Sequence, residues 1–328
     1  MNPHDFPHFP LGTFPTPLQP LPRLTAALGG PDLWVKRDDE SGLALGGNKV
    51  RKLEFLLGEA LAQQADVVLT TGGAQSNHAR LTAAAAKRAG LGCILVLRGD
   101  PALAPQGNLL LDHLLGADVR VFACQPEERA IRMAQIADEQ RAAGRRTYVI
   151  PLGGSTGLGA LGYAVAAKEL ADQASAQRLR VDHVIVSSSS GGTQAGLVLG
   201  TRLYGLPWRV WGITPDATEV ELQALVADVA SQAAALLGLP PIPPAEIIVR
   251  DAYVGPGYGV MTPECRQAIR LVARTEGLLL DPVYTGKAMS GLIDLIRRGI
   301  LQKGETVVFW HTGGTPALFA YAAELQGE

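Results

Sequence analysis

Three cations crowd one short stretch of the chain, GGNKVRKLEF at residues 46 to 55: Lys49, Arg51 and Lys52. The stretch has the pattern of a helix start, where the helix dipole favours Asp or Glu over cations. A local rule broken in this way is typical of a functional site, although most lysines are solvated surface groups. Because neighbouring positive charges disfavour a further one, we expect a lowered pKa for the Lys49 amine. Arg51 and Lys52 either contribute to this or turn outward to pair with acids.

Four glycine-rich turns lie where apolar runs give way to helical patterns, and ligands of open parallel sheets bind at such places. The turns are TTGGAQSNHAR (70–80), PLGGSTGLG (151–159), SSSSGGTQAGL (187–197) and WHTGGTPAL (310–318). The third turn resembles an anion cradle, because glycines and the N–H groups of a helix start can surround a phosphate. A tight turn with Ser and Thr caps explains it equally well. It lacks the GxxxxGK[ST] and GxGxxG spacings, which disfavours ATP and dinucleotides.

Other polar residues stand at comparable junctions. QSNHAR places Ser76, Asn77 and His78 where N–H groups and the Ser76 hydroxyl could hold a carboxylate, although a plain N-cap is the commoner role. A Ser-His-Asp triad there has no positional support, and the stretch lacks the GxSxG pattern. Tyr258 in VGPGYG and Tyr284 in LDPVYTGKA stand beside glycines, where a phenol can face a cleft, although most buried tyrosines serve packing.

A phosphate cradle without nucleotide spacing, combined with a lysine in a glycine turn, indicates pyridoxal 5'-phosphate as the cofactor. A neutral Lys49 amine can bind its aldehyde covalently and later move the α-proton of an amino-acid substrate.

The elements that must position these residues alternate between short β-branched runs and longer amphipathic ones. The predicted strands are Leu33–Arg37, Val67–Thr71, Cys93–Leu97, Val119–Phe122, Thr147–Ile150, Val184–Ser187, Val210–Ile213, Ile247–Arg250, Leu278–Leu280 and Thr306–Trp310. The predicted helices include Lys49–Gln63, Asn77–Ala89, Glu127–Ala143, Leu158–Ala171 and Pro263–Glu276. This alternation predicts an α/β fold with two open, mostly parallel twisted sheets and flanking helices. Seven of the 22 prolines fall in the first 22 residues and predict an extended arm packed over the body.

Composition narrows the class of protein. With 328 residues, 47% of them hydrophobic and 18% charged, the chain is globular and long enough for two domains. A net charge of −2 does not favour binding to nucleic acid or to an anionic membrane. No apolar run is long enough to span a bilayer. We expect Cys93, Cys124 and Cys265 to be buried free thiols, as in a reducing compartment. The first residues do not have the pattern of a signal peptide, so we expect a cytoplasmic protein. The histidine spacing predicts no metal site.

Six motifs in order carry a resemblance over almost the whole chain: LGGNKVRKLEFL, GGAQSNHAR, SSGGTQAGL, GPGYG, DPVYTGKAM and HTGGTP. Together they resemble the family of 1-aminocyclopropane-1-carboxylate (ACC) deaminase and D-cysteine desulfhydrase. The resemblance implies a pyridoxal-phosphate enzyme with the fold of the tryptophan synthase β-subunit (fold type II), usually a homodimer. It implies a large cofactor-binding domain from residues 1–47 and 162–328, and a small α/β domain from residues 48–161.

The resemblance also implies residue roles. Lys49 would carry the cofactor, Asn77 would bind its 3-hydroxyl group, and Ser190, Gly191, Gly192 and Thr193 would hold its phosphate. Ser76, Asn77 and His78 would receive the substrate carboxylate, with Ser76, Tyr258 and Tyr284 as catalytic residues beside Lys49.

Two positions depart from the ACC deaminase pattern, in which Glu follows the DPVY tyrosine and Leu stands in the HxGG motif. Here they are Thr285 and Thr312, both expected to bind the cofactor. ACC has no α-hydrogen, and its ring opening calls for a carboxylate opposite the pyridine nitrogen to keep the ring a strong electron sink. The two threonines match the D-cysteine desulfhydrase pattern, so the resemblance implies α,β-elimination of D-cysteine to pyruvate, hydrogen sulfide and ammonia.

Several alternatives stay open: ACC, D-serine or L-cysteate as the substrate, a binding protein without turnover, and a serine hydrolase using Ser76. A sulfonate such as that of cysteate needs a cation, and His78 is the motif residue that could supply one.

Overall fold

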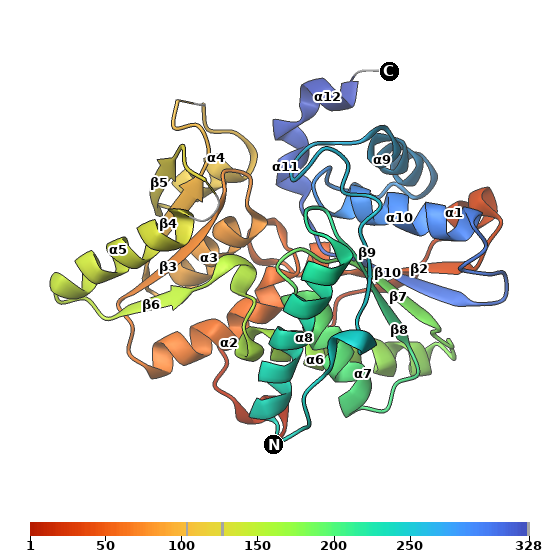
Figure 1. Ribbon diagram of the computed structural model, residues 1–328, viewed down its shortest axis with the longest axis horizontal. Helices are drawn as coiled ribbons and strands as arrows, with labels where there is room; N and C mark the ends of the chain where they lie inside the picture. The colour runs from red at the N-terminus through yellow and green to blue at the C-terminus, as the bar shows by residue number, and fades with distance from the viewer. Residues whose placement is uncertain (103, 126–127, 327–328) are drawn as a thin grey trace.

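Ten strands form two separate sheets in the computed structural model, which describes residues 1–102, 104–125 and 128–326 (Figure 1). The larger sheet has the order β1-β2-β10-β7-β8-β9, and the smaller has the order β5-β4-β3-β6. Every pairing is parallel except that of β1 with β2. The strands are β1 Leu18–Pro20, β2 Asp32–Arg37, β3 Val67–Gly73, β4 Gly92–Arg98, β5 Asp118–Phe122, β6 Thr147–Ile150, β7 His183–Ser187, β8 Arg209–Ile213, β9 Ile248–Arg250 and β10 Thr306–His311.

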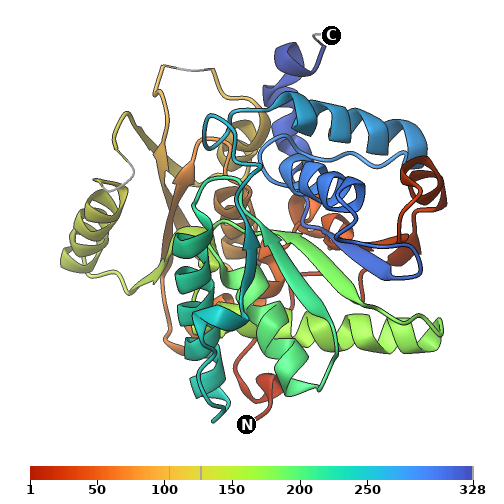
Figure 2. The same cartoon turned by 45° about the vertical axis from the view of Figure 1, so that its right-hand side comes forward.

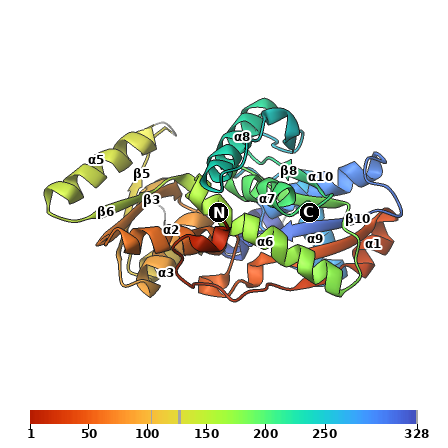
Figure 3. The same cartoon turned by 90° about the horizontal axis from the view of Figure 1, so that it is seen from below.

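Helices cover both faces of each sheet (Figures 2 and 3). They are α1 Pro22–Leu28, α2 Lys49–Ala62, α3 Asn77–Arg88, α4 Gly107–Leu114, α5 Glu128–Ala142, α6 Gly157–Ala176, α7 Gly192–Leu203, α8 Glu219–Leu236, α9 Pro263–Glu276, α10 Thr285–Arg297, α11 Thr315–Ala320 and α12 Ala322–Gln326.

Alternation along the strands of the larger sheet divides their side chains between two cores. Val308 and Trp310 of β10 pack with α6, α7 and α8, whereas Val307 and Phe309 pack with α1, α9 and α10. The smaller sheet likewise packs against α2, α3 and α4 on one face and α5 on the other.

Helices α2 and α6 join the two sheets. They lie in the middle of the molecule, with the small sheet to one side and the large sheet to the other (Figure 1). Their backbones approach closely, because a Cβ added at Gly162 would lie 2.2 Å from the Arg51 carbonyl oxygen. Only glycine fits there. The start of α2, where Lys49 sits, is thereby fixed between the sheets.

Most predicted elements are confirmed, with ends shifted by one or two residues and α6 extended to Ala176. Two sheets with flanking helices are also confirmed. The predicted start of one helix, Glu127, lies outside the described residues. The domain boundaries stay a prediction.

The predicted strand Leu278–Leu280 is wrong. Leu278 and Leu280 are buried in the core beside α9 and α10, while Leu279 is 52% exposed. No strand among the described residues pairs with this segment. Its apolar residues are explained by packing alone. A short strand absent from the prediction, β1, pairs with β2.

The proline-rich N-terminal segment is extended over the body, as predicted, apart from a 3-10 turn at Pro3–Asp5. Phe9 N donates to the Glu54 carbonyl on α2, and Thr16 N donates to Glu169 on α6. Of the predicted buried thiols, Cys93 and Cys265 are buried, but Cys124 is only half-buried, because it follows the edge strand β5. Within the described part of the chain, no helix is long and apolar enough to cross a membrane.

Candidate active site

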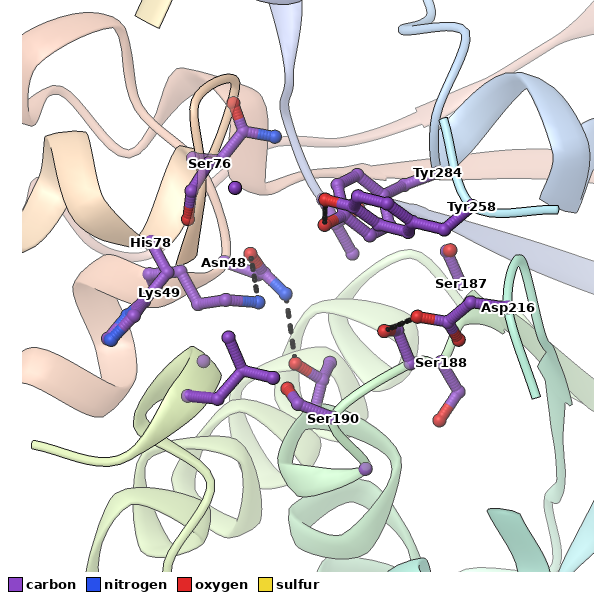
Figure 4. Close-up of a pocket in the computed structure, with 18 of the residues that line it drawn as sticks. Asn48, Lys49, Ser76, His78, Ser187, Ser188, Ser190, Asp216, Tyr258 and Tyr284 are labelled. Carbon is purple, nitrogen blue, oxygen red and sulfur yellow. Dashed lines mark hydrogen bonds between the residues drawn. The ribbon is translucent and has the colours of Figure 1, made fainter. Parts of the chain in front are cut away.

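A cavity of about 300 Å³ lies where strands of both sheets end. Gly73 and Arg98 line it from the ends of β3 and β4, and Ser187 and Thr312 line it from the ends of β7 and β10. Ten predicted site residues meet there: Lys49, Ser76, Asn77, His78, Ser190, Gly191, Thr193, Tyr258, Tyr284 and Thr312. Figure 4 shows Lys49, Ser76 and His78 on one side, facing Ser187, Ser188 and Asp216 on the other.

The Lys49 amine faces this cavity from the first residue of α2 (Figure 4). Burial lowers its pKa to about 8. The predicted direction agrees, but the predicted cause, repulsion from neighbouring cations, does not, since burial accounts for the shift. Lys49 Nζ lies 3.2 Å from Asn48 Oδ1, and Asn48 Nδ2 donates to Thr193 Oγ1 at 2.9 Å. The lysine is thereby tied to the start of α7.

The other two cations of the opening stretch point elsewhere. Arg51 is 3% exposed and makes paired hydrogen bonds, of 2.8 to 2.9 Å, to both Asp38 and Glu169. Lys52 Nζ instead lies 3.2 Å from both the Gly153 carbonyl oxygen and Ser155 Oγ. Burial and the charge of Lys49 hold the pKa of Lys52 well below its usual range. Arg51 is therefore structural, whereas Lys52 lies beside Gly153, which lines the cavity.

The turn from β7 into α7 forms a cradle. Its last residue before α7, Gly191, has φ of +79° and no side chain that could cap the helix. A Cβ added at Gly192 would lie 2.8 Å from Lys52 Nζ and 2.7 Å from Ser155 Oγ, so glycine keeps this space open. Gly192 itself does not line the cavity, whereas its chain neighbours Gly191 and Thr193 do. The cradle combines a helix start, hydroxyl groups and one amine.

Ser76 and Asn77 occupy the start of α3. Ser76 Oγ accepts from Ala79 N at 3.1 Å, so the hydroxyl caps the helix and its own proton is left for a ligand. Asn77 Oδ1 accepts from Asn108 Nδ2 at 2.9 Å. This orients the amide and leaves Asn77 Nδ2 as a donor at the cavity, as a ring hydroxyl or carboxylate would need.

His78 is neutral and cannot supply the cation that a sulfonate needs. The Thr70 hydroxyl donates to the Ile150 carbonyl at 2.8 Å, so His78 Nε2, 2.8 Å from Thr70 Oγ1, must carry the proton. Burial, with Lys49 and Lys52 nearby, holds its pKa well below the usual range. The alternative in which His78 supplies a cation for a sulfonate therefore loses its support.

Tyr258 and Tyr284 act as a pair. Their hydroxyl oxygens lie 2.7 Å apart, with the rings tilted by 64° (Figure 4). Burial raises the pKa of both phenols, and the neighbouring Tyr258 raises that of Tyr284 further. Both are protonated at neutral pH and can donate protons, whereas neither is a base.

The two threonines differ in position. Thr312 lines the cavity, and its carbonyl accepts from Asn48 N at 3.0 Å. Thr285 lies outside the lining, fully buried, and its hydroxyl donates to Asp281 Oδ1 and accepts from Asp281 N, both at 2.7 Å. Its one proton is thus engaged by Asp281, and its role toward the cofactor stays a prediction.

Several side chains at this site were not predicted from the sequence. Asn48, Arg98, Arg129 and Asp216 line the cavity, and Lys52 lies beside the cradle. Asn48 and Lys52 flank Lys49 and could have been found from that motif. Arg98 ends β4, Asp216 lies in the loop after β8 and Arg129 lies at the start of α5, and none of the three belongs to a recognised motif. Burial raises the pKa of Asp216, which accepts from Ser189 Oγ at 2.5 Å.

The residues present fit pyridoxal phosphate. Ser187 and Ser188 have buried hydroxyls without a hydrogen-bond partner among the described residues, as expected where a polar ligand belongs. The cradle with Lys52 would hold the phosphate, Lys49 would bind the aldehyde, and Asn77 would face the ring hydroxyl. In the described part of the chain, no group of three or more His, Cys, Asp and Glu residues could hold a metal ion.

Comparisons with known proteins agree with this fit. The family model described as "Pyridoxal-phosphate dependent enzyme" matches residues 10–313. A protein of Pyrococcus abyssi named putative ACC deaminase is 43% identical, over 98% of this chain and 95% of its own length. An ACC deaminase of Burkholderia vietnamiensis is 44% identical, over 98% of both chains.

A solved structure shows the same fold. The crystal structure of an ACC deaminase homologue has a TM-score of 0.91 and 42% identity, covering 98% of this chain and 96% of the other. The chain therefore belongs to the family of pyridoxal-phosphate dependent enzymes, with fold type II, and is a lyase of the ACC deaminase group.

Proposed function

We propose that this enzyme breaks a bond to Cβ of a small α-amino acid and releases ammonia and a keto acid. ACC deamination is the first candidate, because the names of relatives about 43% identical favour it over the D-cysteine reaction expected from the motifs. The observation that carries the lyase proposal is a buried amine, Lys49, with a pKa of about 8 in one cavity with a phenol pair and an anion cradle.

Bound pyridoxal phosphate would supply an electron sink for negative charge that develops on the substrate. The start of α3, with the Ser76 hydroxyl, would bind the substrate carboxylate. Lys49, neutral at or above pH 8, would take a proton from carbon. The Tyr258–Tyr284 pair would donate a proton, to ring carbon in ACC or to the leaving sulfur in D-cysteine, because both phenols stay protonated.

D-Cysteine desulfhydration is the second candidate, and Thr285 and Thr312 favour it. No Glu follows Tyr284, and Thr285 donates to Asp281, so this position offers no carboxylate to keep a pyridine nitrogen protonated. Elimination from D-cysteine needs less electron withdrawal than opening the ACC ring, because an α-proton is available.

Product analysis distinguishes the candidates. The pyridoxal-phosphate-loaded protein is incubated with ACC, D-cysteine, L-cysteine and L-cysteate, and keto acids, sulfide and sulfite are measured. 2-Oxobutyrate from ACC supports the first candidate, and pyruvate with sulfide from D-cysteine supports the second. L-Cysteate is included because Arg98 and Arg129 line the cavity, although His78 is neutral. No keto acid from any substrate, despite bound cofactor, would contradict the lyase proposal.

From the sequence we also propose a cytoplasmic homodimer. Size-exclusion chromatography with light scattering should give twice the chain mass of 34.5 kDa, and a monomer would contradict the proposal.

A further inference from the structure

The loop that carries Tyr258 has no regular secondary structure. It runs through GPGYG between β9 and α9 and belongs to no helix or strand. Gly255, Gly257 and Gly259 have φ of +67°, +151° and +77°, conformations that other residues rarely adopt. Such a loop is poorly suited to hold a phenol in place unless other side chains anchor it.

Two side chains provide anchors on either side of Tyr258. Lys287 Nζ donates to the carbonyl oxygens of Val254 at 2.7 Å and Gly257 at 2.9 Å. The Tyr321 hydroxyl donates to the Gly259 carbonyl oxygen at 2.8 Å. The carbonyls immediately before and after Tyr258 are therefore both held by side chains from other elements.

Lys287 also connects this loop to the rest of the cavity wall. Its Nζ lies 3.3 Å from the carbonyl oxygen of Pro215, the residue before Asp216. Lys287 itself stands on α10, three residues after Tyr284, and its side chain is fully buried. One ammonium thus ties the loops of Asp216 and Tyr258 to the helix that begins beside Tyr284. Its three protons are directed to three carbonyls, which is all that an ammonium can donate.

We propose that Lys287 and Tyr321 are positioning residues that hold the Tyr258 hydroxyl against Tyr284 for proton donation to the substrate. The inference rests on the proposed lyase function and deepens it. Burial lowers the pKa of Lys287, whereas Asp216 and Cys265 raise it, and the three carbonyls further favour the charged form. Neither residue lines the cavity, so neither is expected to touch the substrate.

A double-mutant cycle tests the proposal with whichever substrate gives product. Lys287→Met should lower kcat/KM by roughly 10- to 100-fold, because small misplacements of a catalytic group carry losses of this order. In a Tyr258→Phe background the same change should cost about twofold or less, since the positioned group is already gone. Equal losses in both backgrounds would show a merely structural role and overturn the proposal.

Two further variants serve as an independent test and as a control. Tyr321→Phe removes only one hydroxyl and should show the same pattern with a smaller loss, so the test survives if Lys287→Met fails to fold. Lys303→Met changes an exposed lysine in the turn between α10 and β10 and should leave kcat/KM unchanged. A loss in Lys303→Met equal to that in Lys287→Met would also contradict the proposal.

A readout without turnover separates this inference from the proposed function. Fluorotyrosine is incorporated at the seven tyrosines, and the ¹⁹F signal of Tyr258 is identified by its loss in Tyr258→Phe. Lys287→Met and Tyr321→Phe should shift or broaden that signal and leave that of Tyr204 unchanged. An unchanged Tyr258 signal overturns the positioning role even if the enzyme is active. A changed signal without any product would instead leave the positioning of Tyr258 intact and refute the lyase function.

Discussion

Lys49 and Lys52 lie one helical turn apart on α2, and the positive charge of Lys49 helps to lower the pKa of Lys52. Lys49 reaches the cavity beside Asn48, whereas Lys52 reaches the wall of the cradle beside Ser155 and Gly192. Two like charges so close are costly unless an anion lies nearby. A phosphate group in the cradle would remove this cost.

We predict that Lys52→Met weakens the binding of pyridoxal phosphate by about 10- to 100-fold, the range for loss of a charged hydrogen bond. Pyridoxal, which lacks the phosphate, should bind both proteins within about twofold. Fluorescence titration of the two apoproteins measures this. Equal weakening for pyridoxal and pyridoxal phosphate would place the phosphate elsewhere.

The Lys49 amine should make cofactor incorporation pH-dependent. With a pKa of about 8, it is an ammonium at lower pH and cannot attack an aldehyde. The rate of incorporation into the apoprotein should therefore rise with pH, reach half its maximum near pH 8 and then level off. Stopped-flow absorbance measures it, and a rate that is flat from pH 7 to pH 9 would contradict the assignment.

Arg51 should matter for stability rather than chemistry. Arg51→Met removes the guanidinium that forms an ion pair with the buried carboxylate of Asp38, and such losses cost about 3–5 kcal/mol of the free energy of unfolding. Arg120→Met, which breaks the exposed pair with Asp118, is the control and should cost less than about 1 kcal/mol. Urea unfolding measures both, and similar losses would show that burial is not decisive.

Asp112 should make stability fall as pH rises. Burial raises its pKa to about 8, and its carboxylate oxygens have no hydrogen-bond partner among the described residues. Between the unfolded pKa near 4 and the folded pKa of about 8, the native state binds one more proton than the unfolded state. The free energy of unfolding should therefore fall by at most about 1.4 kcal/mol per pH unit from this residue.

Asp112→Asn removes the titrating group and keeps the shape, so this part of the pH dependence should vanish and the variant should be more stable than the wild type at pH 8. Urea unfolding from pH 5 to pH 8 measures it. Parallel curves for the two proteins would contradict a neutral Asp112.

The sequence predicted the sheets and most of the site because both depend on local patterns. Strands such as Thr147–Ile150 and turns such as SSSSGGTQAG carry their signal within a few residues. The predicted strand Leu278–Leu280 is wrong because an apolar run indicates burial alone. Whether such a run pairs with a strand depends on residues that are distant in the sequence. That His78 Nε2 carries a proton follows from Thr70 and Ile150, which only the fold brings to it.

Site residues that are distant in sequence from the motifs could not be predicted either. Asp216 and Arg98 reach the cavity because β8 and β4 end there, and neither carries a local motif. Lys287 stood inside a recognised motif, DPVYTGKAM, but its three carbonyl partners lie on loops 30 to 72 residues away. The side chain could therefore be noticed from the sequence, whereas its contacts could not.

Lys49 should bind the cofactor covalently. The protein is loaded with pyridoxal phosphate, reduced with borohydride and digested, and the modified peptide is identified by mass spectrometry. We predict one phosphopyridoxyl group, on Lys49, and none in the Lys49→Ala variant. Modification of Lys52 or another lysine in the wild type, with Lys49 unmodified, would contradict the account.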